Sequence, residues 1–158
     1  MRKIYLLLVA GVSAAPVLAD NGTVFGPGQY QVLDGGTIIA SGKHLKLQHI
    51  AVPSLKTSCR IGTKLRDCGR ISRSQLMDLT VAASVVCRSA GNGKSFCTAG
   101  GFDLSEQMVY TGWAVPTSGA PAKYWTQMAG ARARKRGFWK AEFVPAWPPQ
   151  RKALNEKP

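Results

Sequence analysis

Residues 29–50 read QYQVLDGGTIIASGKHLKLQHI, and this stretch decides the fold. It contains three runs rich in apolar and β-branched residues, Gln29–Leu33, Thr37–Ala40 and His44–Ile50. Two glycine turns separate the runs, Asp34-Gly35-Gly36 and Ser41-Gly42-Lys43. Short strands joined by tight turns form an antiparallel meander, so we predict three consecutive strands here.

The rest of the chain mixes helix and strand patterns, which predicts an α+β fold. We expect a polar loop over 59–68, a helix over 70–82, strands over 84–88 and 94–99, and helices over 103–112 and 121–136. Asp103 followed by Glu106 fits a capping box, and Gly137 is the expected C-cap of the last helix. This order is compatible with a five-stranded OB-fold β-barrel with about three helices.

The first nineteen residues have the layout of an export signal. Arg2 and Lys3 precede an apolar run over 4–12, and small residues lead to Ala19. A membrane-spanning helix needs about 20 apolar residues, more than this run has. We therefore predict cleavage after Ala19, a periplasmic or extracellular protein without a membrane span, one domain over 20–149 that starts with a loose leader over 20–28, and a disordered charged tail over 150–158.

The mature chain is small and strongly basic. Removing residues 1–19 leaves 139 of 158 residues, enough for one domain with a core. The chain carries a net charge of +13, of which Arg2 and Lys3 supply two, so the mature charge is +11. This excess favours polyanions such as nucleic acid, acidic polysaccharide or an anionic membrane surface. The alternative is a solvated basic surface without a specific partner.

The basic residues that we expect to bind a polyanion come from several parts of the sequence, Lys46, Lys94, Arg132, Arg134, Lys135 and Arg136. The last four crowd the end of the helix predicted over 121–136. Cations there also complement the helix dipole, so they have a purely structural explanation as well.

All four cysteines lie in the mature part, Cys59, Cys68, Cys87 and Cys97. An even number in a small exported domain favours two disulfides, and four cysteines allow three pairings. A zinc site is the alternative, but the sequence has no C-x-x-C pair, and neither His44 nor His49 lies in a ligand pattern with them. Because 59 and 68 bracket one short loop and 87 and 97 lie on expected neighbouring strands, we predict those two pairs.

Several motifs resemble the staphylococcal-nuclease-like (thermonuclease) family, in its exported bacterial branch. The segment VLDGGTII over 32–39 resembles the family's "DGDT" hairpin, and LKLQHIAVPS over 45–54 resembles its next strand and loop. Further matches follow in the family's order, Cys68-Gly69-Arg70, Gly101-x-Asp103-Leu104, Met108-Val109-x-x-Gly112-Trp113-Ala114, Ala131-Arg132-x-x-x-x-Gly137-x-Trp139 and Phe143-Val144-Pro145-x-Trp147. The resemblance covers about residues 29–147 and implies the OB-type barrel named above.

The resemblance also implies a calcium-dependent phosphodiesterase site, which this sequence retains only in part. Calcium requires several oxygen ligands. Asp34 and Thr37 match the family, but Gly36 and Ala51 stand where it has two ligand acids. Ser54 stands where it has the glutamate usually assigned as the base.

The arginines that hold the phosphate in the family are also changed. Lys46 replaces the first and keeps the charge without the planar fork. The second would fall near Asn92 or Lys94. We therefore expect no intact catalytic residue set, no metal site and no cofactor. Asp34 is then a turn residue, and we interpret His49 as a packing or surface histidine rather than a catalytic one.

These observations favour a monomeric, catalytically degenerate module that binds a polyanion, or alternatively an envelope protein. One rival is an active DNA or RNA endonuclease with a rearranged metal site, for which Asp67, Asp78 or Asp103 would supply acids. Their positions in the pattern instead indicate a loop, a helix and a cap. A further rival is a structural periplasmic protein whose charge only maintains solubility.

The export signal generates the first testable prediction. Protein recovered from the periplasm or the medium should begin at Asp20, because the small-residue cleavage site ends at Ala19. Intact-mass spectrometry measures this directly. Exported material that retains Met1 would contradict the prediction.

Overall fold

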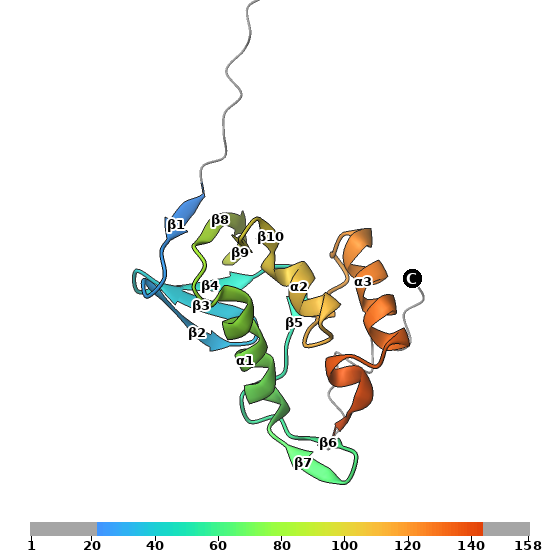
Figure 1. Ribbon diagram of the computed structural model, residues 1–158. Coiled ribbons are helices and arrows are strands. Elements are labelled where there is room, and N and C mark those ends of the chain that lie inside the picture. Colours follow the sequence, from blue (N-terminus) through green and yellow to red (C-terminus); the bar gives the residue numbers. More distant parts are fainter. Residues whose placement is uncertain (1–21, 144–158) are drawn as a thin grey trace, which may run out of the picture.

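The computed structural model describes residues 22–143 and shows an α+β protein (Figure 1). The predicted signal sequence, the charged tail and the motif residues 144–147 lie outside the described residues. The strands are β1 Thr23–Phe25, β2 Tyr30–Asp34, β3 Thr37–Ala40, β4 Lys43–Leu47, β5 Ile50–Ala51, β6 Cys59–Ile61, β7 Lys64–Arg66, β8 Val85–Gly91, β9 Lys94–Ala99, β10 Phe102–Asp103, β11 Val115–Pro116 and β12 Glu142–Phe143. The helices of this part of the chain are α1 Cys68–Thr80, α2 Leu104–Tyr110, α3 Ala122–Ala133 and the 3₁₀ helix η1 Gly137–Lys140.

The main sheet has the strand order β1-β8-β9-β4-β3-β2, with β10 added beside β9. The predicted meander is confirmed, because β2, β3 and β4 pair antiparallel in sequence order. β4 and β9 are parallel, and β8 and β9 form a long antiparallel hairpin. Within residues 22–143 no pairing joins β1 to β2, so these pairings do not close the sheet into a barrel. The finding is a mixed fold with a multi-strand sheet.

Two segments that we predicted to be irregular form strands. Residues 59–68 were expected to be a polar loop, but β6 and β7 form a hairpin there, and β6 also pairs with β12. Residues 20–28 were expected to be a loose leader, yet β1 pairs with β8. Both predictions were wrong because these strands are fixed by partners distant in the sequence. β7 is exposed along its whole length and shows no apolar alternation.

The helix predicted over 121–136 ends earlier than expected. α3 stops at Ala133, and Lys135 takes a left-handed backbone with a φ of 50°. Gly137 is therefore not the C-cap of α3 but the first residue of η1. Four cations lie within the five residues 132–136 at this end of the helix, where the chain turns to place η1 against Gly112.

The turn between β2 and β3 packs directly against α1. A Cβ atom added at Gly35 would overlap the Ser72 side chain, so only glycine fits this contact. The Ser72 hydroxyl donates a hydrogen bond to the carbonyl oxygen of Trp113 at 2.8 Å. Three segments therefore meet at one buried point, the β2–β3 turn, α1 and the chain that follows α2.

Asp103 joins α2 to α3. As predicted it caps α2, because its Oδ1 accepts hydrogen bonds from the backbone of Ser105 and Glu106 at 3.0 and 3.2 Å. Its Oδ2 accepts a 2.6 Å hydrogen bond from the Tyr124 hydroxyl. Burial and this carboxylate raise the pKa of Tyr124, so the hydroxyl remains a donor. The Glu106 carboxylate accepts a 2.6 Å hydrogen bond from Lys123 Nζ. No hydrogen bond from the Asp103 backbone N–H to Glu106 completes the predicted capping box within the described residues.

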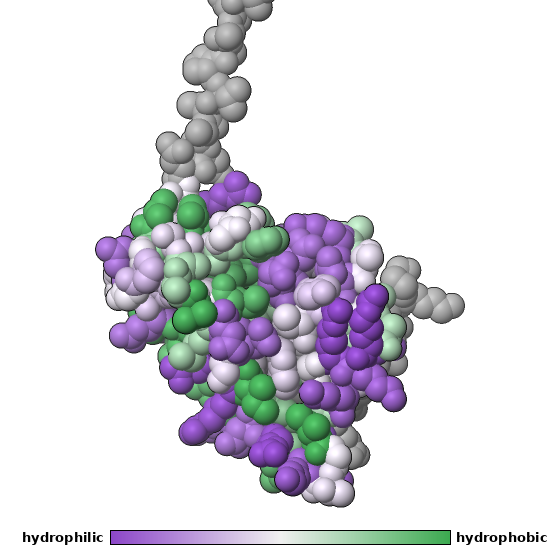
Figure 2. Space-filling model, in the orientation of Figure 1, coloured by the Kyte–Doolittle hydropathy of each residue, from purple (hydrophilic) through white to green (hydrophobic). Residues whose placement is uncertain are grey.

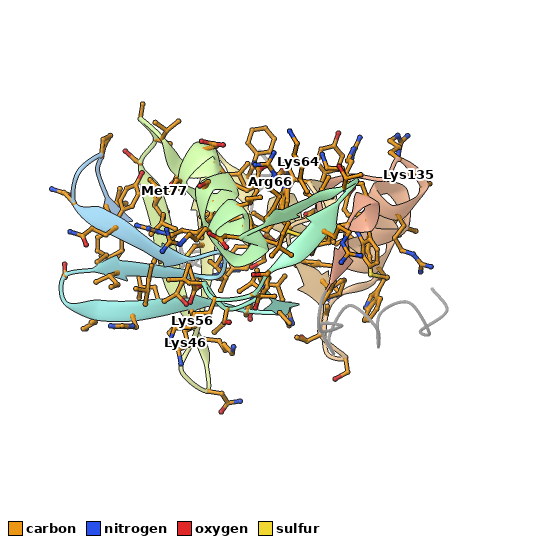
Figure 3. All side chains as sticks on the ribbon, turned by 90° about the horizontal axis from the view of Figure 1, so that it is seen from below. Lys46, Lys56, Lys64, Arg66, Met77 and Lys135 are labelled. Carbon is orange, nitrogen blue, oxygen red and sulfur yellow. A yellow bond between two sulfur atoms is a disulfide. The ribbon has the colours of Figure 1, made fainter. Side chains whose placement is uncertain are left out.

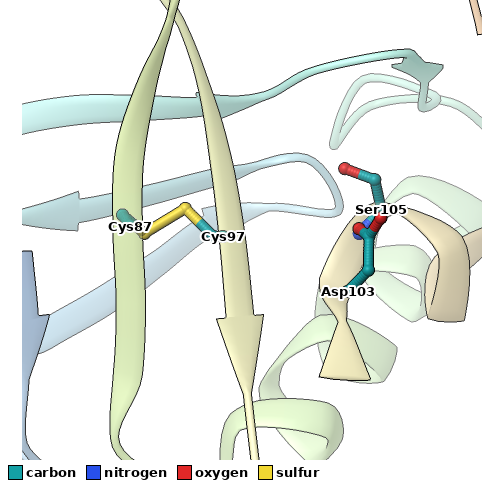
Figure 4. The surroundings of a disulfide bond; sticks show 4 residues. All are labelled: Cys87, Cys97, Asp103 and Ser105. Carbon is teal, nitrogen blue, oxygen red and sulfur yellow. A yellow bond between two sulfur atoms is a disulfide. The ribbon is translucent and has the colours of Figure 1, made fainter. Parts of the chain in front are cut away.

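Both predicted disulfides are confirmed. Cys59–Cys68 ties the β6–β7 hairpin to the start of α1, with 5.7 Å between the Cα atoms. Cys87–Cys97 joins directly paired residues of β8 and β9, at a Cα separation of 4.2 Å. Figure 4 shows this second disulfide beside the entry to α2, where Asp103 and Ser105 lie. The two bonds hold the hairpin and the sheet independently.

The surface is mixed on the face shown in Figure 2. Hydrophilic residues gather over the hairpin at the bottom and over the side that carries α3. The exposed hydrophobic side chains of the described chain include Val24, Leu65, Met77 and Val81. No described helix is long and apolar enough to cross a membrane.

The Gly35 contact generates a stability prediction. Gly35→Ala should lower the free energy of unfolding by about 1–3 kcal/mol, because the added methyl has to displace Ser72 or the β2–β3 turn. Gly119→Ala is the matched control, since a Cβ there meets nothing within 4 Å. Urea titration of both variants gives the comparison. Equal stability of the two variants would refute a tight contact at Gly35.

Candidate functional site

The structure aligns four of the predicted site positions across four neighbouring strands. Asp34 of β2 pairs with Thr37 of β3, Thr37 pairs with Lys46 of β4, and Lys46 pairs with Lys94 of β9. Paired residues on adjacent strands lie at the same level of a sheet. We call these four residues the cross-strand row. Lys94, rather than Asn92 in the hairpin turn, is therefore the residue opposite Lys46.

Asp34 acts first as a turn residue. Its Oδ1 accepts a hydrogen bond from the backbone N–H of Gly36 at 2.8 Å. This contact fixes the β2–β3 turn in the way short carboxylates often do. One carboxylate oxygen is thus already engaged in local structure, as we expected for Asp34.

Gly36 lies between Asp34 and the loop after β5. A Cβ at Gly36 would be 3.2 Å from Val52 Cγ2 and 3.9 Å from Asp34 Oδ1. Gly36 is not among the glycines with positive φ, so its backbone suits any residue. Val52, which directly follows β5, therefore packs against the β2–β3 turn.

Ala51 has a local role in β5, and Ser54 has one in the loop that follows β5. Ala51 pairs with Val115 in the small β5–β11 sheet. The Ser54 hydroxyl shares a 3.1 Å hydrogen bond with the Thr57 hydroxyl, and its carbonyl packs against Gly69 at the start of α1. Neither Ala51 nor Ser54 has a carboxylate, and Gly36 has no side chain. Asp34 is therefore the only acid among these four positions. Such a donor set does not fit calcium, which needs several oxygen ligands.

The acids considered for a rearranged site have other surroundings. Asp103 is buried in the cap of α2, Asp67 precedes α1, and Asp78 is exposed on α1. Across residues 22–143, no group of three or more His, Cys, Asp or Glu side chains is placed to hold a metal ion.

His49 has a packing role. It takes a φ of 64° in the turn after β4, rather than continuing the strand as predicted. Its ring meets the Tyr124 ring edge-on, with 5.9 Å between centroids. Its carbonyl accepts a 2.8 Å hydrogen bond from the backbone of Thr117. These contacts agree with our interpretation of His49 as structural.

The basic residues in the last turn of α3 and directly after it are separate from the cross-strand row. Figure 3 shows Lys135 at the far end of the molecule from Lys46. The Arg136 guanidinium lies 4.1 Å from the centroid of the Tyr110 ring, and that of Arg132 lies 5.4 Å from the Trp139 ring. Arg134 and Lys135 are exposed. Two of these four cations thus pack on aromatic rings, and the set does not form one basic face with Lys46.

Sequence reasoning missed the cations next to the cross-strand row. Lys43 and Arg88 line a groove that also reaches Lys94. Lys43 is the first residue of β4, whereas the sequence pattern had placed it in the turn before that strand. Only the long-range pairing of β4 with β9 brings it close to β8.

No protein-family model matches this chain. A search of curated proteins also finds no significant match. The family resemblance therefore rests on the sequence motifs alone.

The proximity of Gly36 to Asp34 and to Val52, which follows Ala51 in the chain, generates a prediction about metal binding. The triple variant Gly36→Asp, Ala51→Asp, Ser54→Glu should bind calcium with a Kd of about 10⁻⁴–10⁻³ M, the range of weak protein sites. Isothermal titration calorimetry measures the affinity. A charge-matched control places the acids on dispersed exposed positions, Gly119→Asp, Ser74→Asp and Thr126→Glu. A folded triple variant that binds calcium no better than this control would show that the three positions do not converge.

Proposed function

We propose that this protein is an exported, catalytically degenerate relative of the staphylococcal-nuclease-like proteins that binds polyanions through its basic sheet. The observation that carries the proposal is the direct pairing of Lys46 with Lys94 on adjacent strands.

The sheet topology supports an OB-type fold. A three-stranded meander leads into α1, and the β8–β9 hairpin then returns to pair parallel with β4. We interpret the main sheet as a five-stranded OB barrel built from β2, β3, β4, β8 and β9, with β1 as an added strand. Barrels of this kind commonly bind oligonucleotides and oligosaccharides.

The charge arrangement supports anion binding. Like charges directly opposite each other on neighbouring strands destabilise a sheet. Within residues 22–143, neither Lys46 nor Lys94 has an acidic partner, and both are exposed. An anion bound between the two ammonium groups would relieve their repulsion. The mature charge of +11 adds a long-range attraction for polyanions.

The residues at the nuclease-like positions argue against catalysis. Gly36 and Ala51 supply no metal ligand, and Ser54 supplies no base. Removing a single group that stabilises a transition state typically costs about a hundredfold or more in rate. Losing several together should leave only background activity, so binding is the function that remains.

The disulfides support export. Both bonds are intramolecular and use all four cysteines. Disulfides persist in oxidising compartments such as the bacterial periplasm. Together with the predicted signal sequence, they favour a function in the cell envelope or outside the cell.

Binding should depend steeply on salt. We expect the mature protein to bind labelled single-stranded DNA and acidic polysaccharide, with log K falling by about 0.7 per contacted phosphate for each unit of log salt on single-stranded DNA. The variant Lys46→Ala, Lys94→Ala should flatten that slope by about two contacts. The control is Arg134→Ala, Lys135→Ala, at the distant end of α3. Fluorescence anisotropy at several salt concentrations measures both slopes.

Two outcomes would overturn the proposed function. Calcium-dependent cleavage of DNA or RNA by the unmodified mature protein, lost on chelation, would show that the protein is an active nuclease. Absence of binding at low salt, or an affinity that does not change with salt concentration, would favour a structural protein or a protein that binds an envelope protein.

A further inference from the structure

A groove opens where β4 separates from β9. The two strands pair only at Lys46–Lys94 and Leu47–Ser95, so within the described chain the first residues of β4 pair with β3 alone. The groove has a volume of about 490 Å³, and residues of β1, β3, β4, β8 and β9 line it. Small-ligand sites typically have volumes of about 300–1,000 Å³. The groove therefore has room for a ligand, or for part of a ligand, that consists of a few rings.

The groove is positively charged. Lys43, His44, Arg88 and Lys94 line it, and none of its described lining residues is acidic. Over residues 22–143, Lys43 and Lys94 form no ion pair. The Arg88 guanidinium lies 4.4 Å from the centroid of the Phe96 ring at the edge of this region. Walls of one charge concentrate the electric field inside a cleft, so the groove favours an anionic ligand.

The remaining lining groups suit a ligand rich in hydroxyls. Ser41 and Ser89, which are both exposed, bring two hydroxyl groups to the groove, whereas Ser95, which also lines it, is buried. The side of β4 turned away from β3 adds backbone donors and acceptors, because it has no strand partner ahead of Lys46. Such groups can donate to and accept from sugar hydroxyls.

The groove lacks what single-stranded nucleic acid usually needs. Base recognition in such sites relies on aromatic faces on which bases stack. Two described aromatic rings line the groove, that of Phe25, which is only 8% exposed, and the imidazole of His44. Neither Tyr nor Trp is among the described lining residues. The lining therefore favours a carbohydrate polyanion over a nucleic acid.

The geometry points to this groove as the binding site for an acidic oligosaccharide. The carboxylate or sulfate groups of the sugar lie on Lys43 and Lys94, and its hydroxyls pair with the two exposed serines and the edge of β4. This inference rests on the proposed function and specifies the polyanion and where it binds. Lys94 connects the groove to the cross-strand row, so a longer chain continues from one to the other.

A steric block tests the site without changing its charge. Thr23 of β1 lines the groove and pairs with Cys87, whereas Val24 is 61% exposed and points to the opposite face of β1. Thr23→Trp should raise the Kd for an oligogalacturonate hexamer or a heparin-derived hexasaccharide by about tenfold or more. Val24→Trp, with the same added volume on the same strand, should leave both affinities unchanged. The two acidic sugars separate carboxylate from sulfate recognition.

A charge variant gives an independent readout. Lys43→Gln should weaken binding of the preferred sugar by about fivefold, which is the loss of one ionic contact. The control Lys135→Gln removes the same charge at the distant end of α3 and should have a smaller effect. Isothermal titration calorimetry of the mature protein measures all affinities, and thermal unfolding verifies that each variant is folded.

The outcomes separate this inference from the proposed function. If the unmodified protein binds no polyanion in a salt-dependent way, the proposed function itself fails. If it does bind polyanions, but Thr23→Trp and Val24→Trp behave alike, polyanion binding stands and the groove is not the site. Equal affinity for neutral maltohexaose would exclude charge recognition. An oligothymidylate that binds more tightly than both sugars and is blocked by Thr23→Trp would assign the groove to nucleic acid.

Discussion

The contact between Gly35 and Ser72 is the constraint on which the arrangement of the sheet and helices depends. Because no side chain fits at Gly35, the β2–β3 turn can approach the backbone of α1 closely. Ser72 then bonds to the Trp113 carbonyl, so the same side chain sets the position of the segment after α2. The turn that Gly35 occupies also carries Asp34 and Gly36, and its position against Val52 follows from this packing. The geometry of the candidate site is thus a consequence of a core contact.

The cross-strand row is a backbone framework whose side chains can change without changing the alignment. Four strands place Asp34, Thr37, Lys46 and Lys94 at one level, and backbone pairing alone maintains that alignment. Hydrogen bonds between strands do not depend on whether a position carries an aspartate, a glycine or a lysine. Side-chain replacement can therefore remove metal ligands and leave the fold in place. At its β4–β9 end the row carries Lys46 and Lys94, neither of which has an acidic ion-pair partner within residues 22–143, an arrangement suited to holding an anion.

Local signals predicted the parts of the fold that local interactions determine. The glycine turns of the meander, the β8–β9 hairpin, the Asp103 cap and both disulfides could be read from the sequence, since each joins residues close along the chain. β1 and the β6–β7 hairpin could not. β1 exists because it pairs with β8, some sixty residues away. The exposed β7 carries no apolar alternation, so nothing in its own composition indicated a strand.

For the candidate site, the sequence by itself determined which functional groups are present: one acid, one threonine hydroxyl, two lysines and a large positive charge on the whole chain. Residue identity decides ligand chemistry without reference to the fold. Only the tertiary structure decided which of those groups meet. It paired Lys46 with Lys94, separated both from the cations after α3, and opened a groove beside Lys43. The physical reason is that the parallel pairing of β4 with β9 joins segments more than forty residues apart, and where that pairing stops depends on the packing of the whole sheet.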